Sequence, residues 1–359
     1  MNNKIYTKII GTGSYIPTRC VKNTDFLDRK FYNPDGTLID KSNEEIIDKF
    51  QQITTISERR FVKDHLVTSD IAFFAAKNAI EETAIDKESL DYIIVAHNFG
   101  DVRQNHNRTD LVPTLAARVK QKLKIINPNT IAYDLPFGCP GWLQAVIQGD
   151  YFIRSGDVKR ILVIGAEVLS RVSDPHDRDS MLYADGAAAT LLEAKASSIP
   201  TGLLAHKTRS DTLVYASMLH MGKSYHSNGD GEDIFLKMSG RKLYQYALET
   251  VPQSIKACLD SCHLHIDDIK YVLIHQANGK MDDAILQRLY ALYDIETIPQ
   301  DVMPMTVSYL GNSSVATIPT LLDLILKNQM ENYSIAPGDR VVFASVGAGM
   351  NINAAVHSF

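Results

Sequence analysis

The sequence is poor in cysteine, in excess charge and in long apolar runs, and each shortage excludes a class of protein. Its 359 residues include four cysteines, too few for a fold stabilised mainly by disulfides. No C-x-x-C pair, a common metal-binding pattern, occurs. The 37 basic and 42 acidic residues give a net charge of −5, so no overall positive field attracts nucleic acid or an anionic membrane. An acidic partner would therefore have to meet a local basic patch.

No apolar run approaches the roughly 18 residues that span a bilayer, so we expect no membrane segment. Residues 1–13 lack the apolar core of a secretory signal. Apolar residues make up 45% and charged residues 22%, which excludes a disordered or coiled-coil chain. These features predict a folded protein of the reducing cytoplasm.

Short β-branched runs alternate with longer helical patterns, which is typical of an α/β fold with helices on both faces of its sheets. The expected strands are residues 92–96, 161–165, 271–275 and 341–345. The expected helices include residues 70–84, after the capping pair Thr68 and Ser69, and residues 241–262.

Three segments are predicted to be turns or loops. The stretch from Gly11 to Tyr15 lacks the third glycine of a dinucleotide-binding loop and is interpreted as a turn. Residues 31–40, with Asn-Pro-Asp-Gly, and residues 220–233, with Asn-Gly-Asp-Gly, have strong turn chemistry. We expect both to be loops, the second mobile, that shape an entrance.

The chain repeats part of itself, which indicates a duplicated fold. The run that begins at Tyr92 has a counterpart that begins 179 positions later, and the run after Arg160 has one 180 positions later. Cys139 and Asn312 each follow a glycine before an apolar helix. Two unrelated strand–helix units also resemble each other, but three matches in the same order favour duplication. We expect an N-terminal half, residues 1–200, and a C-terminal half, residues 201–359.

Cys139 is the strongest candidate nucleophile. It lies between a predicted strand and a helix that begins near Pro140, where a proline loses no helical hydrogen bond. The unpaired N–H groups and the dipole at such a helix start favour a thiolate. The plainer alternative is a small buried side chain without chemical function.

His275 and Asn312 are candidate partners of Cys139. His275 ends a predicted strand, where α/β sheets contact ligands, and its counterpart in the other half is Ala96. Asn312 occupies in the second half the place that Cys139 occupies in the first. If the halves pack about an approximate two-fold axis, the three side chains converge. The order Cys, His, Asn also occurs in papain-type peptidases, although the duplication and the mid-chain cysteine argue against that class.

Two further groups have weaker signals. The backbone N–H groups of Gly347, Ala348 and Gly349 follow a predicted strand and can stabilise an oxyanion, but the same pattern fits a plain turn. Cys258 and Cys262 are four apart on a helix, with His263 and His265 beyond, and core packing explains them better than zinc binding. We expect no metal site.

With these residues in place, the chain resembles the β-ketoacyl-acyl carrier protein synthase III family of the thiolase superfamily over nearly its whole length. The resemblance rests on ordered motifs: Gly138-Cys139, Asp174-Pro175-His176-Asp177-Arg178, Asp185-Gly186-Ala187, Lys237-Met238-Ser239-Gly240, His275-Gln276-Ala277-Asn278, Gly311-Asn312-Ser313-Ser314 and Gly347-Ala348-Gly349.

The resemblance implies a five-layer αβαβα fold, a homodimer and a decarboxylative Claisen condensation without a resident cofactor. Cys139 would take an acyl group from acyl-CoA or an acyl carrier protein, and malonyl-acyl carrier protein would then supply an enolate. His275 Nε2 and Asn312 Nδ2 would donate to the enolate oxygen. The N–H of Cys139 and one in 347–349 would bind the acyl oxygen, although Ala348 replaces a family glycine.

Departures from the family bear on the substrate. Residues 42–50 lack the tryptophan and arginine that the family places around the adenine of coenzyme A. Arg178, Lys280 and Asn278 match substrate contacts, and Val112 stands where a phenylalanine often reaches the partner subunit's acyl pocket. A smaller Val112 predicts a longer or carrier-bound primer. The inserted loop at residues 31–40 and the missing tryptophan favour a specialised lipid or polyketide pathway over fatty-acid initiation.

Three alternatives remain at this stage: acyl transfer without decarboxylation on the same fold, the cysteine peptidase, and a binding module without catalysis.

Overall fold

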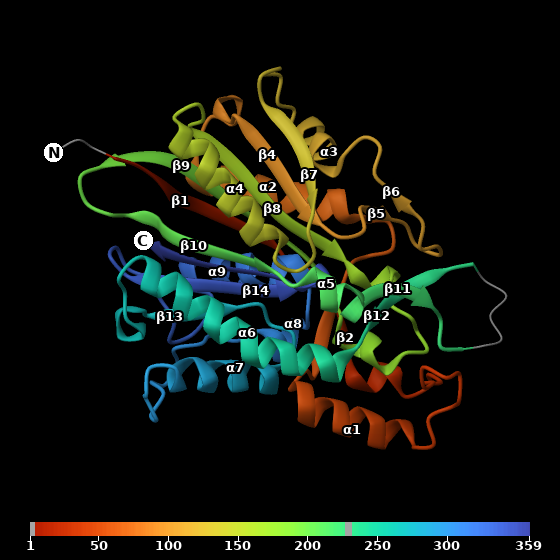
Figure 1. The fold of residues 1–359 in the computed structure, drawn as a ribbon. Coiled ribbons are helices and arrows are strands. Elements are labelled where there is room, and N and C mark those ends of the chain that lie inside the picture. The colour runs from red at the N-terminus through yellow and green to blue at the C-terminus, as the bar shows by residue number, and fades with distance from the viewer. Residues whose placement is uncertain (1–3, 227–231) are drawn as a thin grey trace.

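The computed structural model describes residues 4–226 and 232–359, and its core consists of two sheets (Figure 1). The first sheet has the strand order β1-β9-β8-β4-β7. β9 is antiparallel to both β1 and β8, whereas β4 is parallel to β8 and β7. Its strands are β1 (Lys4–Tyr15), β4 (Tyr92–His97), β7 (Ile131–Pro136), β8 (Arg160–Val168) and β9 (Asp185–Ser197).

The second sheet repeats the plan of the first with the order β10-β15-β14-β13. β15 is antiparallel to β10 and β14, and β13 is parallel to β14. Its strands are β10 (Gly202–Ser210), β13 (Tyr271–Ile274), β14 (Arg340–Gly347) and β15 (Asn351–Ser358). The expected boundary at residue 200 lies in the connection between β9 and β10.

Five layers result, because helices cover the outer face of each sheet and two helices lie between the sheets. α2 (Thr68–Thr83) and α3 (Leu115–Lys122) pack on the first sheet, and α6 (Gly240–Ser261), with α7 (Gly279–Ala291) against it, packs on the second. α4 (Gly141–Ser155) and α9 (Thr317–Leu326) share one buried cluster with both sheets. The fold is therefore the duplicated thiolase-like α/β architecture that the resemblance implied.

Short elements surround this core. The two-stranded pairs are β2 (Arg19–Lys22) with β3 (Glu58–Phe61), β5 (Asp101–Val102) with β6 (Thr109–Asp110), and β11 (Leu219–Lys223) with β12 (Ile234–Met238). The remaining α-helices are α1 (Asn43–Thr54), α5 (Thr212–Tyr215) and α8 (Val307–Leu310). Within the described residues, none of the helices combines the length and apolarity needed to cross a bilayer.

Most predicted elements are present within a few residues, but two of the predicted loops are wrong in part. Residues 11–15 belong to β1, because the missing side chains of Gly11 and Gly13 let α2 lie directly on the strand, where a Cβ atom would collide with Thr83 or with the α2 backbone. Part of the segment 220–233 forms β11, while residues 227–231 lie outside the described residues. Residues 31–40 are a loop with one turn, Gly36 N to Asn33 O at 2.9 Å.

Candidate active site

Cys139, His275 and Asn312 line one cavity of about 220 Å³, although they come from opposite halves of the chain. Most of the remaining wall is apolar, and it includes Phe99, Leu169, Leu219, Met221, Leu236, Met238, Leu243, Met281 and Val346. A few polar groups in a largely apolar cavity are typical of a site that binds an apolar chain and orients its reactive end.

The turn between β7 and α4 holds Cys139 against the end of β14. Pro140 is the N-cap residue of α4, and the segment from Gly347 to Gly349 follows β14. A Cβ atom on Gly347 would lie 2.7 Å from the backbone nitrogen of Cys139, so only glycine permits this approach. Ala348 lines the same cavity. The predicted oxyanion segment therefore lies beside the thiol.

The resting thiol of Cys139 differs from the thiolate that the helix start predicts. Burial and the negative charge of Glu167 raise the pKa of Cys139 to about 11. A hydrogen bond from Ser314 and the backbone N–H of Cys139 itself lower that pKa, but they do not outweigh burial. The structure corrects the expectation: at neutral pH a base has to remove the thiol proton.

His275 is a neutral imidazole in this cavity. Burial lowers its pKa to about 4. Its Nδ1 atom lies 2.8 Å from the hydroxyl of Thr317, which also reaches the carbonyl oxygen of Ser314 at 3.0 Å. When the hydroxyl donates to Ser314, Nδ1 carries the imidazole proton and Nε2 is an acceptor. When it donates to Nδ1, Nε2 carries the proton and is a donor.

The carboxamide of Asn312 is fixed by the backbone around it. Its Oδ1 accepts a hydrogen bond from the backbone N–H of Ser314 at 2.8 Å, and the backbone N–H of Asn312 donates to the carbonyl of Leu182 at 3.0 Å. The side chain is buried. Because Oδ1 faces the backbone, the two Nδ2 hydrogens are left for a ligand.

The β11–β12 hairpin forms one wall of the cavity, a role that sequence reasoning missed. Lys237 of β12 anchors the hairpin through Nζ, which lies 2.5 Å from Asp174 Oδ2 and 3.2 Å from Asp177 Oδ2. All three side chains are buried, and Nζ lies 3.3 Å from the ring centre of Tyr225. Lys237, Asp174 and Asp177 belong to the sequence motifs 237–240 and 174–178, but the spacing of these motifs does not indicate that the lysine forms ion pairs with the two aspartates.

None of the four predicted substrate-contact residues lines the cavity of its own chain. Arg178 and Lys280 are exposed, whereas Asn278 caps α7 by accepting from the N–H of Met281 at 2.9 Å. Val112 is 87% exposed. Roles for these residues in substrate binding stay predictions.

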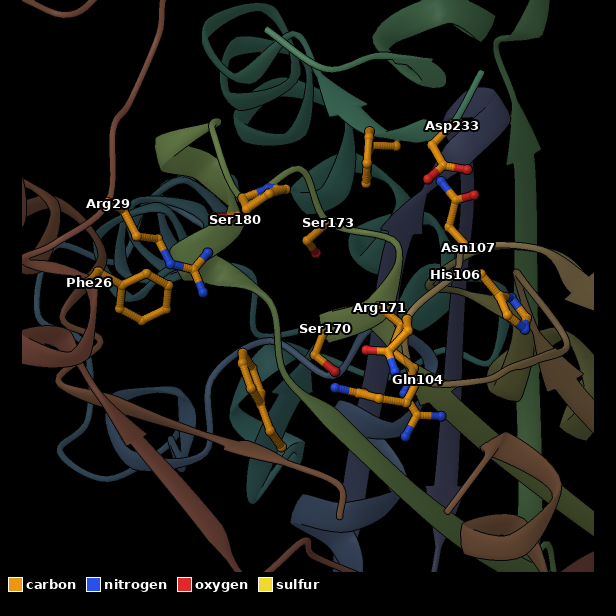
Figure 2. Close-up of a pocket in the computed structure, with 14 residues that line it drawn as sticks. Phe26, Arg29, Gln104, His106, Asn107, Ser170, Arg171, Ser173, Ser180 and Asp233 are labelled. Atoms are coloured by element: carbon orange, nitrogen blue, oxygen red, sulfur yellow. The ribbon is translucent and has the colours of Figure 1, made fainter. Parts of the chain in front are cut away.

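A second cavity has a volume of about 320 Å³, and Figure 2 shows residues that line it, among them Arg29, Arg171 and Ser173. Ser170 and Phe235 line it, whereas their neighbours Leu169 and Leu236 line the first cavity. Its Arg171 donates to the carbonyls of Val102, Lys63 and Asp64, so its guanidinium is engaged by the protein itself. Within residues 4–226 and 232–359, no group of three or more His, Cys, Asp and Glu side chains is arranged to hold a metal ion.

Comparison with known proteins agrees with this geometry. The family model described as 3-oxoacyl-[acyl-carrier-protein (ACP)] synthase III matches residues 133–212, and the model of its C-terminal part matches residues 259–359. The chain is 30% identical over 356 residues to Beta-ketoacyl-[acyl-carrier-protein] synthase III 1 of Vibrio parahaemolyticus. This alignment covers 99% of this chain and 100% of that protein.

Two solved structures extend the comparison to the fold. The synthase III of Aquifex aeolicus is similar with a TM-score of 0.79 and 28% identity, over 98% of this chain and 100% of the other. The synthase III of Thermus thermophilus is similar with a TM-score of 0.80 and 29% identity, and the match covers 98% of this chain and 99% of the other. The chain therefore belongs to the 3-oxoacyl-[acyl-carrier-protein] synthase III family, whose members are ketosynthase-type transferases that work with acyl carrier protein.

Proposed function

We propose that the protein joins an acyl primer to malonyl-acyl carrier protein in two steps, with Cys139 as the acyl carrier. In the first step the sulfur of Cys139 attacks the primer thioester, and the thiol of coenzyme A or of a carrier leaves with the proton. In the second, malonyl-acyl carrier protein loses CO₂, its enolate carbon attacks the acyl carbon, and the Cys139 thiolate leaves. The product is a 3-oxoacyl-acyl carrier protein.

The placement of Cys139, His275 and Asn312 on one largely apolar cavity is the observation that carries this proposal. Nδ2 of Asn312 supplies a donor for the enolate oxygen. The Nε2 atom of His275 accepts the thiol proton when Thr317 donates to Ser314, and it donates to the enolate when Thr317 turns to Nδ1. Donors fixed where negative charge develops lower the barrier more than they favour the bound substrate. The N–H groups of Cys139 and of residues 347–349 would bind the acyl oxygen.

The primer, we propose, is a medium or long acyl group, either on coenzyme A or on a carrier protein. The hairpin wall offers apolar contacts along the cavity. Val112, exposed in this chain, would reach the acyl pocket of a second copy in a cytoplasmic homodimer, and no resident cofactor is needed. Arg178 and Lys280, with Arg241 and Arg288, are our candidates for a basic patch that meets an acidic carrier protein.

Intact-mass measurement after incubation with acyl donors of several chain lengths tests the first step. We expect the wild-type protein to gain one acyl mass on the peptide that contains Cys139, and Cys139→Ser to gain none. Equal labelling of both proteins would overturn the nucleophile assignment. A Cys258→Ser variant is the matched control, because Cys258 is buried away from the cavity and should leave labelling unchanged.

Release of CO₂ from malonyl-acyl carrier protein tests the second step. Asn312→Asp keeps an acceptor for the N–H of Ser314 but places a carboxylate where the enolate forms. We expect it to acylate normally and to lose decarboxylation by about a hundredfold or more. Full decarboxylation by this variant would contradict the donor role. Acyl transfer to an alcohol or amine with no CO₂ release from the wild type would favour the alternative acyltransferase.

A further inference from the structure

A buried chain of hydrogen bonds runs from a carboxylate to the sulfur of Cys139. The amide Nδ2 of Asn98 donates to Oε2 of Glu167 at 2.5 Å and to Oγ of Ser314 at 3.2 Å. The hydroxyl of Ser314 in turn donates to Sγ of Cys139 at 3.3 Å. Glu167 is fully buried, and Asn98, Cys139 and Ser314 line the substrate cavity.

The direction of the bonds in this chain follows from Oε2 of Glu167. That oxygen accepts from Nδ2 of Asn98, so the NH₂ end of the Asn98 amide faces the carboxyl group. The backbone N–H of Asn98 also donates to the same oxygen, at 2.9 Å. The second Nδ2 hydrogen then points to Ser314, whose oxygen is occupied as an acceptor. The hydroxyl hydrogen of Ser314 is left for the sulfur.

We propose that Ser314 stabilises the Cys139 thiolate by hydrogen bonding, and that Asn98 and Glu167 are positioning residues that hold the Ser314 hydroxyl in this direction. The inference rests on the proposed role of Cys139 as nucleophile. It adds three residues to the Cys139, His275 and Asn312 constellation: Ser314, two residues after Asn312, and Asn98 and Glu167, which come from the end of β4 and from β8.

Hydrogen bonds to an ionised acceptor are stronger than bonds between neutral groups, so the Ser314 hydroxyl favours the thiolate over the thiol. The effect has the expected sign, because this bond lowers the pKa of Cys139 while burial and the charge of Glu167 raise it. Glu167 therefore opposes the thiolate by its charge and supports it by orienting Asn98. His97, whose Nε2 lies 3.2 Å from Asp134 Oδ2, lowers the pKa of Glu167 against the larger effect of burial.

Backbone geometry supports a dedicated role for Ser314. Its φ angle is 53°, in the left-handed region that a serine rarely adopts. The N–H of Ser314 is held there by Asn312 Oδ1, and its carbonyl accepts from Thr317. Such conformations persist where the surroundings enforce them, and here they place one hydroxyl between the thiol and Asn98.

The rate of Cys139 alkylation by iodoacetamide, followed on the Cys139 peptide by mass spectrometry, tests the inference without any substrate. Because only the thiolate reacts, we expect Ser314→Ala and Asn98→Ala to react about tenfold more slowly than wild type at about pH 7. The ratio of the wild-type alkylation rate to that of each variant should stay the same across the pH range in which the rate rises with pH. Ser313→Ala, the matched control in the same turn, should react like wild type.

Asn98→Thr tests the direction of the bonds. A threonine hydroxyl has one hydrogen, which Glu167 would take, so its oxygen would accept from Ser314 and turn that hydroxyl away from the sulfur. We expect Asn98→Thr to react as slowly as Asn98→Ala, with an unchanged circular dichroism spectrum and melting temperature. A wild-type alkylation rate in Ser314→Ala or in Asn98→Thr would overturn the inference. Failure of the wild type to accept any acyl group would instead overturn the proposed function, because alkylation needs no acyl transfer.

Discussion

The hydroxyl of Thr317 lies 2.8 Å from Nδ1 of His275 and 3.0 Å from the carbonyl oxygen of Ser314. Its one hydrogen can therefore be donated either to Nδ1 or to that carbonyl. The position of that hydrogen decides which nitrogen of the neutral imidazole is protonated. Thr317 therefore connects the two chemical roles proposed for His275, a base toward the thiol and a donor toward the enolate.

Replacing Thr317 by valine should separate these roles, because valine has nearly the same shape but no hydroxyl. Nδ1–H can then donate to the carbonyl of Ser314, which leaves Nε2 as an acceptor only. We expect Thr317→Val to acylate Cys139 at the wild-type rate and to decarboxylate malonyl-acyl carrier protein about tenfold more slowly. Thr320→Val, also buried on α9, is the control. Unchanged decarboxylation would show that Thr317 does not set the tautomer.

Glu167 should make the stability of the protein depend on pH. Burial raises the pKa of Glu167 from 4.5 to about 7. Between these values the unfolded chain loses the proton first while the folded protein keeps it, so the free energy of unfolding falls as pH rises through this window.

The Glu167→Gln variant lacks this titration. The stability of wild type relative to Glu167→Gln should fall by about 3 kcal/mol as pH rises from about 4.5 to about 7. Urea unfolding at several pH values measures the difference, with the exposed Glu44→Gln as control. A constant difference across the window would show that Glu167 is already ionised at low pH.

The parts of the site that could be predicted from sequence are those fixed by local structure. Tyr92 and Tyr271 begin equivalent strands because each opens an apolar, β-branched run. Cys139 and Asn312 each precede a helix after a glycine, so duplication alone brings them to equivalent positions in the two halves. The position of His275 followed from the same argument, since it comes directly after β13.

What could not be predicted depends on contacts between distant parts of the chain. The helix start beside Cys139 favours a thiolate, but burial, which depends on the whole fold, dominates the pKa of its thiol. Asn98 and Ser314 are 216 positions apart, and nothing in either segment indicates that they meet. Gly11 and Gly13 suggested a turn because their role, a close approach by α2, is visible only in the packed structure.

The buried ion pair of Lys237 should be necessary for stability. Lys237→Met would leave the carboxylates of Asp174 and Asp177 buried without their cation, and we expect a loss of about 3 kcal/mol in the free energy of unfolding. Chemical denaturation measures it, and Lys223→Met, on an exposed lysine of β11, should change little. Adding Asp174→Asn should restore part of the loss. If Lys237→Met alone unfolds like wild type, the pair does not anchor the hairpin.

The hairpin wall should also decide which primers enter. Met221 of β11 lines the cavity with Leu219, and Leu236 and Met238 line it from β12. A tryptophan in place of Met221 fills space along the wall, so a long acyl chain collides with it while an acetyl group does not. We expect Met221→Trp to slow acylation of Cys139 by dodecanoyl donors about tenfold or more and to leave acetyl transfer within about twofold of wild type.

Intact-mass kinetics with both donors measures this ratio, and Lys223→Trp on the same strand, outside the cavity wall, is the control. The ratio is the informative quantity, because a general disturbance of the Cys139 turn would slow both donors alike. Equal slowing would therefore contradict a role for the hairpin in primer selection. A selective loss of the long primer would place the acyl chain along β11 and β12, on the side of the cavity that Lys237 and Asp174 hold in position.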